Sequence, residues 1–362
     1  MTGPELPAAI RYLPLVPRPR PAALPLQRRL TELDELVHQA QHAHGAEEGM
    51  ARACEAMNKA ALLASDTGHP DLAATLCWRQ YEAFLPAAPL TVKAATFALQ
   101  PLVNLARLAI RTGNPSDAYT LLESLLAAAD QAEPAQLLGR TCPVGGLVAC
   151  AAERAELRQF LWAVLLADGT RALCAAGRWQ DAVDHLHRYN GIGTRLLDGR
   201  QVAVLAALHR TDPGTATRLL ATTDCAQAWE HAVAACLTTA TRLASGQDSS
   251  AATTAMVNAV LHLPPTPGGA VFAARLGVLA CELAPEHRAL LDHVLFGVLQ
   301  SDDAHTATAA LGSPVVAPQL AKDQQQALRA RVARAELAEN EEPFGVDARL
   351  DQVCAKAARF LT

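Results

Sequence analysis

Apolar residues recur along most of this chain at intervals of three and four positions, with charged and polar residues between them. Leu30, Leu33 and Val37 show the pattern in the first such stretch. This spacing places apolar side chains on one face of an α-helix, so it predicts amphipathic helices. Stretches of β-branched and aromatic residues bounded by turn signals are nearly absent, which argues against a sheet.

Short turns centred on glycine divide the first half of the pattern into pairs of helices. They stand at Gly68, Gly113 and Gly177, each between two helical stretches. The clearest pair spans residues 167–186, where one helix runs up to Ala176 and the next begins at Trp179. The interval between the second and third turns is longer and contains residues 134–146, which we interpret as an inserted loop.

The helical pattern continues to the end of the sequence without a long linker. Gly45 and Gly49 indicate an early break, and the later expected helices cover residues 201–209, 215–221, 227–243, 249–261, 270–283, 286–299, 302–311, 319–340 and 347–360. We therefore predict an all-α protein in which residues 26–362 form one continuous α-solenoid domain. Each helix pair would bury its apolar face against its neighbours.

Residues 1–25 differ from the rest because they contain seven prolines. Proline fixes φ and removes a backbone donor, so this segment is predicted to be an extended arm. Ile10, Leu13 and Leu15 are apolar, which is unusual for a solvated tail. We expect the arm to lie against the body of the protein.

Composition narrows the possible functions. Hydrophobic residues make up 51% of the chain, enough for a large core, and the net charge is −5. The only local group of basic residues, Arg18, Arg20, Arg28 and Arg29, is interpreted as part of a solvated tail, so no direct nucleic-acid partner is expected.

No apolar run reaches the roughly 18 residues needed to span a bilayer, and prolines interrupt the N-terminal segment. The nine cysteines contain no CxxC pair and are interpreted as reduced thiols of a cytoplasmic protein.

The third turn resembles a tetratricopeptide repeat, since Gly177, Trp179 and Ala182 match its small-residue turn and second helix. The earlier turns show parts of the same pattern, Gly68 with Ala73 and Gly113 with Ala118. The resemblance covers residues 50–225, at spacings less regular than an array of about 34-residue repeats. The chain is also similar in style to repeat-containing regions of actinobacterial regulators. This resemblance implies a peptide or protein partner held in a concave groove.

A polar cluster at residues 194–201 is one candidate site. Gly199 stands in its middle, and its polar members are Arg195, Asp198, Arg200 and Gln201. Asp198 and Gly199 suit a tight turn, and the helix beginning after them would present free N–H groups to an anion. The arginines would add bidentate contacts to a carboxylate or phosphate. The alternative is a structural turn whose arginines pair with neighbouring acids.

A second candidate set lies on the first two helix pairs. It contains Arg79, Gln80, Gln100, Asn104 and Arg107. Gln100, Asn104 and Arg107 are three and four positions apart, so they share one helical face. That face would bind the amides or carboxylates of a peptide if it lines a groove, and is an ordinary solvated face otherwise. Asp168 and Arg171 form a similar pair in the third unit.

Sequence signatures of catalysis are largely missing. The chain has no GxSxG, Walker or GxGxxG motif, and nothing assigns a base to Cys142 or Cys150. His38 and His42 share a helix face without an evident third ligand, so no metal or cofactor is predicted. The principal prediction is a non-enzymatic protein that binds a peptide or protein partner. Two alternatives stay open: an enzyme of specialised metabolism, with Asp168 or Asp198 as general base on an anionic substrate, and a regulatory sensor acting through a DNA-binding partner.

Overall fold

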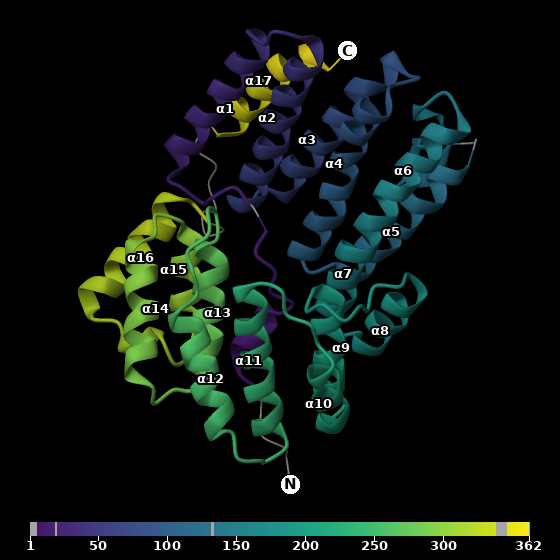
Figure 1. Ribbon diagram of the computed structural model, residues 1–362. Helices are drawn as coiled ribbons and strands as arrows, with labels where there is room; N and C mark the ends of the chain where they lie inside the picture. The colour runs from purple at the N-terminus through teal and green to yellow at the C-terminus, as the bar shows by residue number, and fades with distance from the viewer. Residues whose placement is uncertain (1–5, 19, 132–133, 338–345, 362) are drawn as a thin grey trace. The chain divides into compact units, whose positions relative to one another are not determined.

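The computed structural model describes residues 6–18, 20–131, 134–337 and 346–361. Helices form nearly all of its regular structure, and consecutive helices pack against one another (Figure 1). The all-α prediction is therefore confirmed. None of the helices in the described ranges is both long and apolar enough to cross a membrane.

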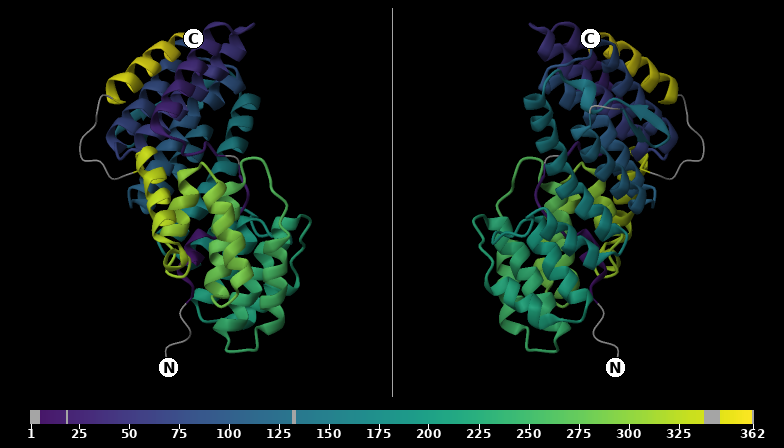
Figure 2. Two further views of the ribbon diagram at one scale, coloured as in Figure 1. Left: turned by 90° about the vertical axis from the view of Figure 1, so that its left-hand side faces the viewer. Right: turned by 90° about the vertical axis from the view of Figure 1, so that its right-hand side faces the viewer.

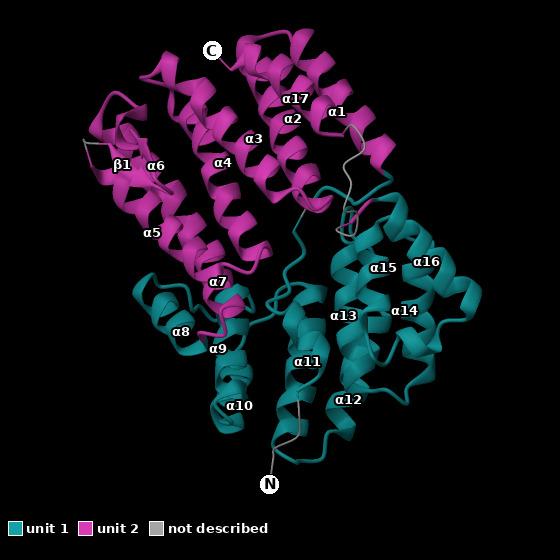
Figure 3. Cartoon of the chain, turned by 180° about the vertical axis from the view of Figure 1, so that it is seen from behind, with its two compact units in different colours: residues 1–25, 179–335 teal, residues 26–178, 336–362 magenta. Residues whose placement is uncertain are grey.

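The chain forms two compact units, each built from two separate stretches of sequence (Figure 3). Unit 1 contains residues 1–25 and 179–335, and unit 2 contains residues 26–178 and 336–362. The boundary at residue 178 divides the third predicted helix pair between the units. The assignment of residues 26–362 to a single domain stays a prediction.

Unit 2 is a sequence of helices in which each packs against the next. Its elements are α1 (Leu26–Gln41), α2 (Ala46–Asp66), α3 (Pro70–Phe84), η2 (Leu85–Ala87), α4 (Val92–Arg111), α5 (Pro115–Asp130), β1 (Ala135–Leu137), β2 (Arg140–Cys142), η3 (Gly145–Leu147), α6 (Ala151–Val164), the π-helical segment η4 (Leu165–Gly169), α7 (Thr170–Ala175), α17 (Val346–Ala357) and η6 (Ala358–Phe360). α4 also contacts α2 and α6, the helices two positions away in the order. α17 comes from the far end of the sequence and packs on α1, α2 and α3 (Figure 2).

The predicted glycine turns are present. Gly68, Gly113 and Gly177 have φ values of 84°, 82° and 70°, in the left-handed region that favours glycine. Gly49 was expected to break the pattern but lies inside α2. A Cβ at this position would be 3.1 Å from the carbonyl oxygen of Ala40 in α1, so the glycine allows the two helices to approach closely.

The inserted loop contains an antiparallel two-stranded hairpin, β1 and β2, which the helical pattern did not predict. Leu138 and Gly139 connect the strands with φ values of 49° and 76°. Positive φ at both central residues matches the twist of a tight hairpin, so three residues per strand are enough to close it.

Unit 1 packs its helices around the proline-rich arm. Its elements are η1 (Ala8–Tyr12), α8 (Trp179–Arg188), α9 (Asp198–His209), α10 (Pro213–Ala221), α11 (Ala228–Ala244), α12 (Ser250–Leu261), α13 (Ala270–Leu283), α14 (Arg288–Gln300), α15 (Ala304–Leu311), η5 (Ala317–Gln319) and α16 (Lys322–Arg334). Leu13 and Leu15 are buried in the same hydrophobic cluster as residues of α9, α11 and α13. The prediction that the arm lies against the body is confirmed, although it also contains the short 3₁₀-helix η1.

Two helix boundaries in unit 1 differ from those expected. α9 begins at Asp198, so Asp198 and Gly199 belong to its first turn instead of preceding it. α16 ends at Arg334, and the last residues of the predicted helix 319–340 lie outside the described residues.

Candidate functional site: a polar row on unit 2

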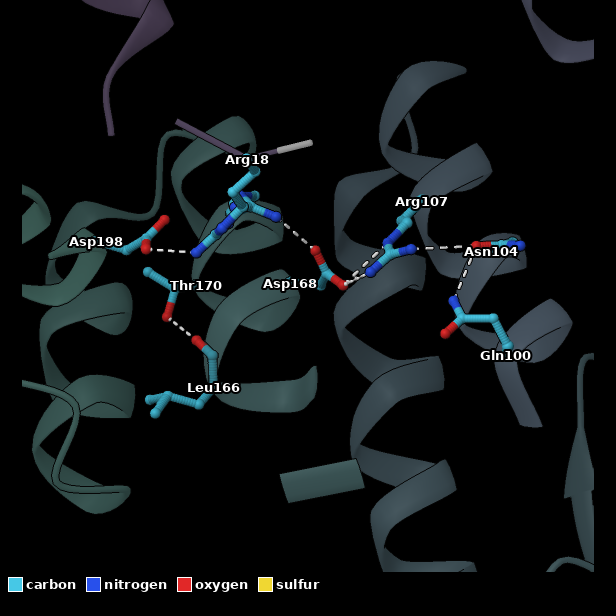
Figure 4. A network of polar contacts seen from close by, with 9 residues as sticks. Arg18, Gln100, Asn104, Arg107, Leu166, Asp168, Thr170 and Asp198 are labelled. Carbon is cyan, nitrogen blue, oxygen red and sulfur yellow. Dashed lines mark hydrogen bonds and ion pairs between the residues drawn. The ribbon is translucent and has the colours of Figure 1, made fainter. Parts of the chain in front are cut away.

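Polar side chains from three neighbouring parts of unit 2 are joined by hydrogen bonds. Figure 4 shows the bonds that link Gln100, Asn104, Arg107 and Asp168. We call this set the polar row; its members are Asn58 of α2, Gln100, Asn104 and Arg107 of α4, Asp168 of η4 and Arg171 of α7. Five of them were predicted as site residues. The structure thus brings together two predicted groups that are about 60 positions apart in the sequence, one on α4 and one around Asp168.

α4 presents its members of the row because of helical periodicity. Gln100, Asn104 and Arg107 follow each other at intervals of four and three residues and are partly exposed or exposed, whereas Leu99 and Val103 are buried. The exposed edge of this face also includes Phe97, one turn before Gln100, which is partly buried. α4 therefore displays a row of polar groups ending in an aromatic side chain.

Asn104 connects the amides of the row. Its Oδ1 accepts hydrogen bonds from Gln100 Nε2 and Arg107 Nη1, both at 3.2 Å, and its Nδ2 donates to Oδ1 of Asn58 at 2.8 Å. These bonds link α2 to α4 through side chains that remain partly exposed. They fix the orientation of three amides that can each donate and accept.

Asp168 anchors the charged end of the row. Its side chain is only 4% exposed, and its Oδ2 accepts from Arg107 Nε at 3.0 Å and Nη2 at 2.8 Å. Its Oδ1 accepts from Arg171 Nη1 at 2.8 Å. A buried carboxylate needs such compensation. Its position in a π-helical segment is notable because single π-helical turns occur frequently at functional sites.

A second buried acid extends the charged surface beside α4. Asp66, at the end of α2, accepts from Arg29 Nη2 at 2.6 Å and from Arg111 Nη1 at 3.0 Å. Arg111 is four residues after Arg107 and is 43% exposed. Arg29 is buried, so its assignment to a solvated tail was wrong.

Sequence reasoning missed Asn58, Asp66 and Arg111. The spacing of Arg111 from Arg107 was a usable signal, because residues four apart share a helix face. Asn58 and Asp66 gave no comparable signal, since their partners on α1 and α4 are distant in the sequence.

The other predicted residues of unit 2 lie elsewhere. Arg79 pairs with Asp351 of α17 at 2.9 Å and so helps hold the C-terminal helix. Gln80 is buried beside Cys54. Burial raises the pKa of the Cys54 thiol to about 12, against the opposing effect of a hydrogen bond with Gln80. Arg79 thus lies in a partly exposed ion pair and Gln80 in the interior, and neither joins the polar row.

The cluster at residues 194–201 belongs to unit 1, and its side chains point to separate partners. Arg195 donates to buried Glu230 at 2.5 Å, and Arg18 donates to Asp198 at 2.6 Å. The other two residues bond backbone and hydroxyl groups. Arg200 donates to the Leu219 carbonyl and to the hydroxyl groups of Thr222 and Thr223, and Gln201 bonds the backbone of Leu15 and Leu196. This arrangement favours a structural role over a shared ligand site.

Burial and neighbouring charges shift the pKa values of two acids in opposite directions: Asp198 of this cluster, and Glu230, which pairs with Arg195. Burial raises the pKa of Asp198 above its usual value, although Arg18 opposes the effect. Burial would also raise the pKa of Glu230, but the backbone N–H groups of Ala226 and Gln227 together with Arg195 hold it below its usual value.

The residues considered for catalysis or metal binding have other roles. Burial raises the pKa of Cys142, whose thiol donates to the Arg140 carbonyl, so its nucleophilic thiolate is disfavoured. His38 and His42 stack at 4.1 Å, and no group of three possible metal ligands occurs within the described ranges.

Comparisons with known proteins give no family for this chain. No protein-family model matches it, and neither a curated protein nor a solved structure is significantly similar to it. The chain is a helical-repeat-like, all-α protein, and its function has to be inferred from the geometry of its own residues.

Proposed function

We propose that this chain is a non-enzymatic, tetratricopeptide-like repeat protein that binds an acidic peptide segment of a partner protein on the polar row of unit 2. The observation that carries the proposal is the pairing of half-exposed arginines with buried aspartates on neighbouring helices. Arg107 and Arg171 are 46% and 35% exposed, whereas the side chain of Asp168 between them is 4% exposed.

The charge balance of this surface favours an anionic ligand. Arg107, Arg111 and Arg171 carry positive charge at the surface, and their counter-charges on Asp66 and Asp168 are buried. A guanidinium group has five N–H donors. Arg107 uses three of them on Asp168 and Asn104, and Arg111 bonds Ser65 and Asp66 through Nη1, so both retain donors for a second carboxylate. The buried acids also fix the guanidinium orientation before binding, which lowers the entropic cost of association.

The amides beside the arginines support a peptide as the ligand. Asn58, Gln100 and Asn104 offer donors and acceptors of the same type as a peptide group. Phe97 adds a partly exposed apolar surface on the same helix. A segment with acidic side chains and an extended backbone would use both kinds of contact.

Binding is favoured over catalysis by the state of the two candidate bases. Both oxygens of Asp168 accept hydrogen bonds from guanidinium groups, and Asp198 is paired with Arg18. A general base must reach the proton that it abstracts. A carboxylate that is buried and already bonded to an arginine is poorly suited to that task.

The test is selection of short random peptides by the full chain, followed by affinity measurements on the selected sequences. We expect enrichment in aspartate and glutamate and an affinity that falls as salt is added. Arg107→Gln and Arg171→Gln should each weaken binding about tenfold, a loss of ~1.4 kcal/mol.

Arg52→Gln is the matched control because Arg52 is 45% exposed on α2 and pairs with Glu55 outside the row. It should bind like the wild type. Selected peptides without acidic residues, or equal affinities for the Arg107 and Arg52 variants, would contradict the proposal.

A further inference from the structure

The N-terminal arm is held in unit 1 through its backbone as well as its side chains. Three side chains from different helices or caps accept hydrogen bonds from its backbone N–H groups: Glu282 from Ala9 at 2.6 Å, Gln201 from Leu15 at 2.7 Å and Asp303 from Ala23 at 3.2 Å. The N–H of Ala304 also donates to the carbonyl of Ala23. Helical side chains therefore satisfy groups that a strand partner would satisfy in a sheet.

Gln201 makes the most specific of these contacts. Gln201 belongs to α9 and is fully buried. Its Oε1 accepts from the N–H of Leu15, and its Nε2 donates to the carbonyl of Leu15 at 2.9 Å. Nε2 also donates to the carbonyl of Leu196 at 3.2 Å. A buried amide is costly without partners, so its presence here depends on an extended segment occupying this position.

Side-chain contacts complete the site. Ala9, Leu13 and Leu15 are buried in the hydrophobic cluster of unit 1. The guanidinium groups of Arg11 and Arg275 lie over the ring of Tyr12, at 5.1 and 5.2 Å from its centre. These contacts favour small and aliphatic residues at the positions of Ala9, Leu13 and Leu15 and an aromatic ring at that of Tyr12.

The arm also ends its buried stretch with a charge contact. Arg18 donates to Asp198 at 2.6 Å. Pro14 and Pro17 each fix one φ angle in this stretch, which lowers the entropy lost when the segment binds. The arm thus has the properties of a peptide ligand: preset backbone, aliphatic anchors and a terminal charge.

We infer that the interior of unit 1 is a binding site for a proline-containing peptide that forms one short 3₁₀-helix followed by an extended stretch, and that residues 6–18 are its tethered occupant, exchangeable for the same segment supplied by another molecule. The ligand has aliphatic residues at the positions of Leu13 and Leu15 and an arginine at that of Arg18. This site belongs to unit 1 and does not depend on the function proposed for unit 2.

Tethering determines how such exchange has to be measured. A segment joined by a short connection acts at an effective concentration of the order of millimolar, so a free peptide competes poorly with it. Cutting the chain after residue 21 removes this advantage without removing residues 6–18. Pro21 is exposed, which makes the junction between Pro21 and Ala22 suitable for an inserted recognition site of a specific protease.

The experiment uses the full chain with this insertion. After cleavage, a fluorescent synthetic peptide of residues 6–21 is added and its binding is followed by anisotropy. We expect one peptide to bind per chain after cleavage, with affinity at least about tenfold higher than before cleavage. A peptide carrying Leu15→Asp should not compete.

Gln201→Leu in the cleaved chain should weaken peptide binding at least about tenfold, because two hydrogen bonds to Leu15 are lost. Gln300→Leu is the matched control at an exposed position of α14 and should leave binding unchanged. If the Gln201 variant fails to fold, the comparison of wild-type and Leu15→Asp peptides on the otherwise unaltered cleaved chain still decides the question.

Two results would overturn the inference. The first is that the labelled peptide binds no faster than unit 1 unfolds, where the rate of unfolding is measured by hydrogen exchange of buried amides in α13. The other is equal binding of the wild-type and Leu15→Asp peptides. Either would make the arm an inseparable part of the core.

Discussion

Arg107 of α4 donates two hydrogen bonds to a single oxygen of Asp168, at 3.0 Å from Nε and 2.8 Å from Nη2. Asp168→Asn should lower the free energy of unfolding by about 1–3 kcal/mol, because hydrogen bonds to a neutral amide are weaker than those to a carboxylate. The loss is limited because the exposed arginine regains hydrogen bonds with water. Urea denaturation measures the change.

A double-mutant cycle with Arg107→Gln isolates the pair, and we expect a coupling energy of about 1 kcal/mol. Asp130→Asn is the control, because its side chain is 62% exposed and it should change stability by less than about 0.5 kcal/mol. A coupling energy of zero would show that the two residues act independently.

Glu230 gives unit 1 a stability that depends on pH. Its pKa is lowered in the folded protein, so its ionised form stabilises the fold above the unfolded value near 4.5. That contribution is lost as pH falls below 4.5 through the folded pKa. Glu230→Gln should cost about 1–3 kcal/mol at pH 7, with the difference from wild type shrinking in acid. Thermal denaturation between neutral pH and pH 3 tests this, and a difference independent of pH would contradict it.

The C-terminal helix α17 is expected to be essential for unit 2. Leu350 is fully buried where α17 packs on α1, α2 and α3, so Leu350→Ala should destabilise by about 2–5 kcal/mol. Hydrogen exchange should show faster exchange of amides in α1–α3. Leu138→Ala is the control: it removes the same atoms from a residue that is 56% exposed, so it should have little effect on stability. Unchanged protection in α1–α3 would refute the role of α17.

Two glycines with open space around them should respond oppositely to alanine. Gly113 has φ of 82°, so Gly113→Ala should cost about 1–2 kcal/mol in backbone strain despite the absence of a clash. Gly297 lies within α14, where Gly297→Ala should stabilise by about 0.5–1 kcal/mol through higher helix propensity. Chemical denaturation of both variants gives the comparison, and a stabilising Gly113→Ala would contradict the turn argument.

Local structure follows from the sequence because its causes are local. The three- and four-residue spacing predicts most helices, and Gly68, Gly113 and Gly177 terminate helices because each adopts positive φ. The same logic grouped Gln100, Asn104 and Arg107 on one face of α4, since positions three and four apart are adjacent on any helix.

The tertiary structure decided which faces meet. It joined Asp168 to Arg107, placed Gln201 against the arm, and returned α17 to unit 2. These contacts connect residues far apart in the sequence, and each depends on how whole helices pack. Helical periodicity indicates which side of a helix is apolar, but the partner that covers it is determined only when the whole chain folds, because burial and hydrogen-bond satisfaction are properties of the assembled core.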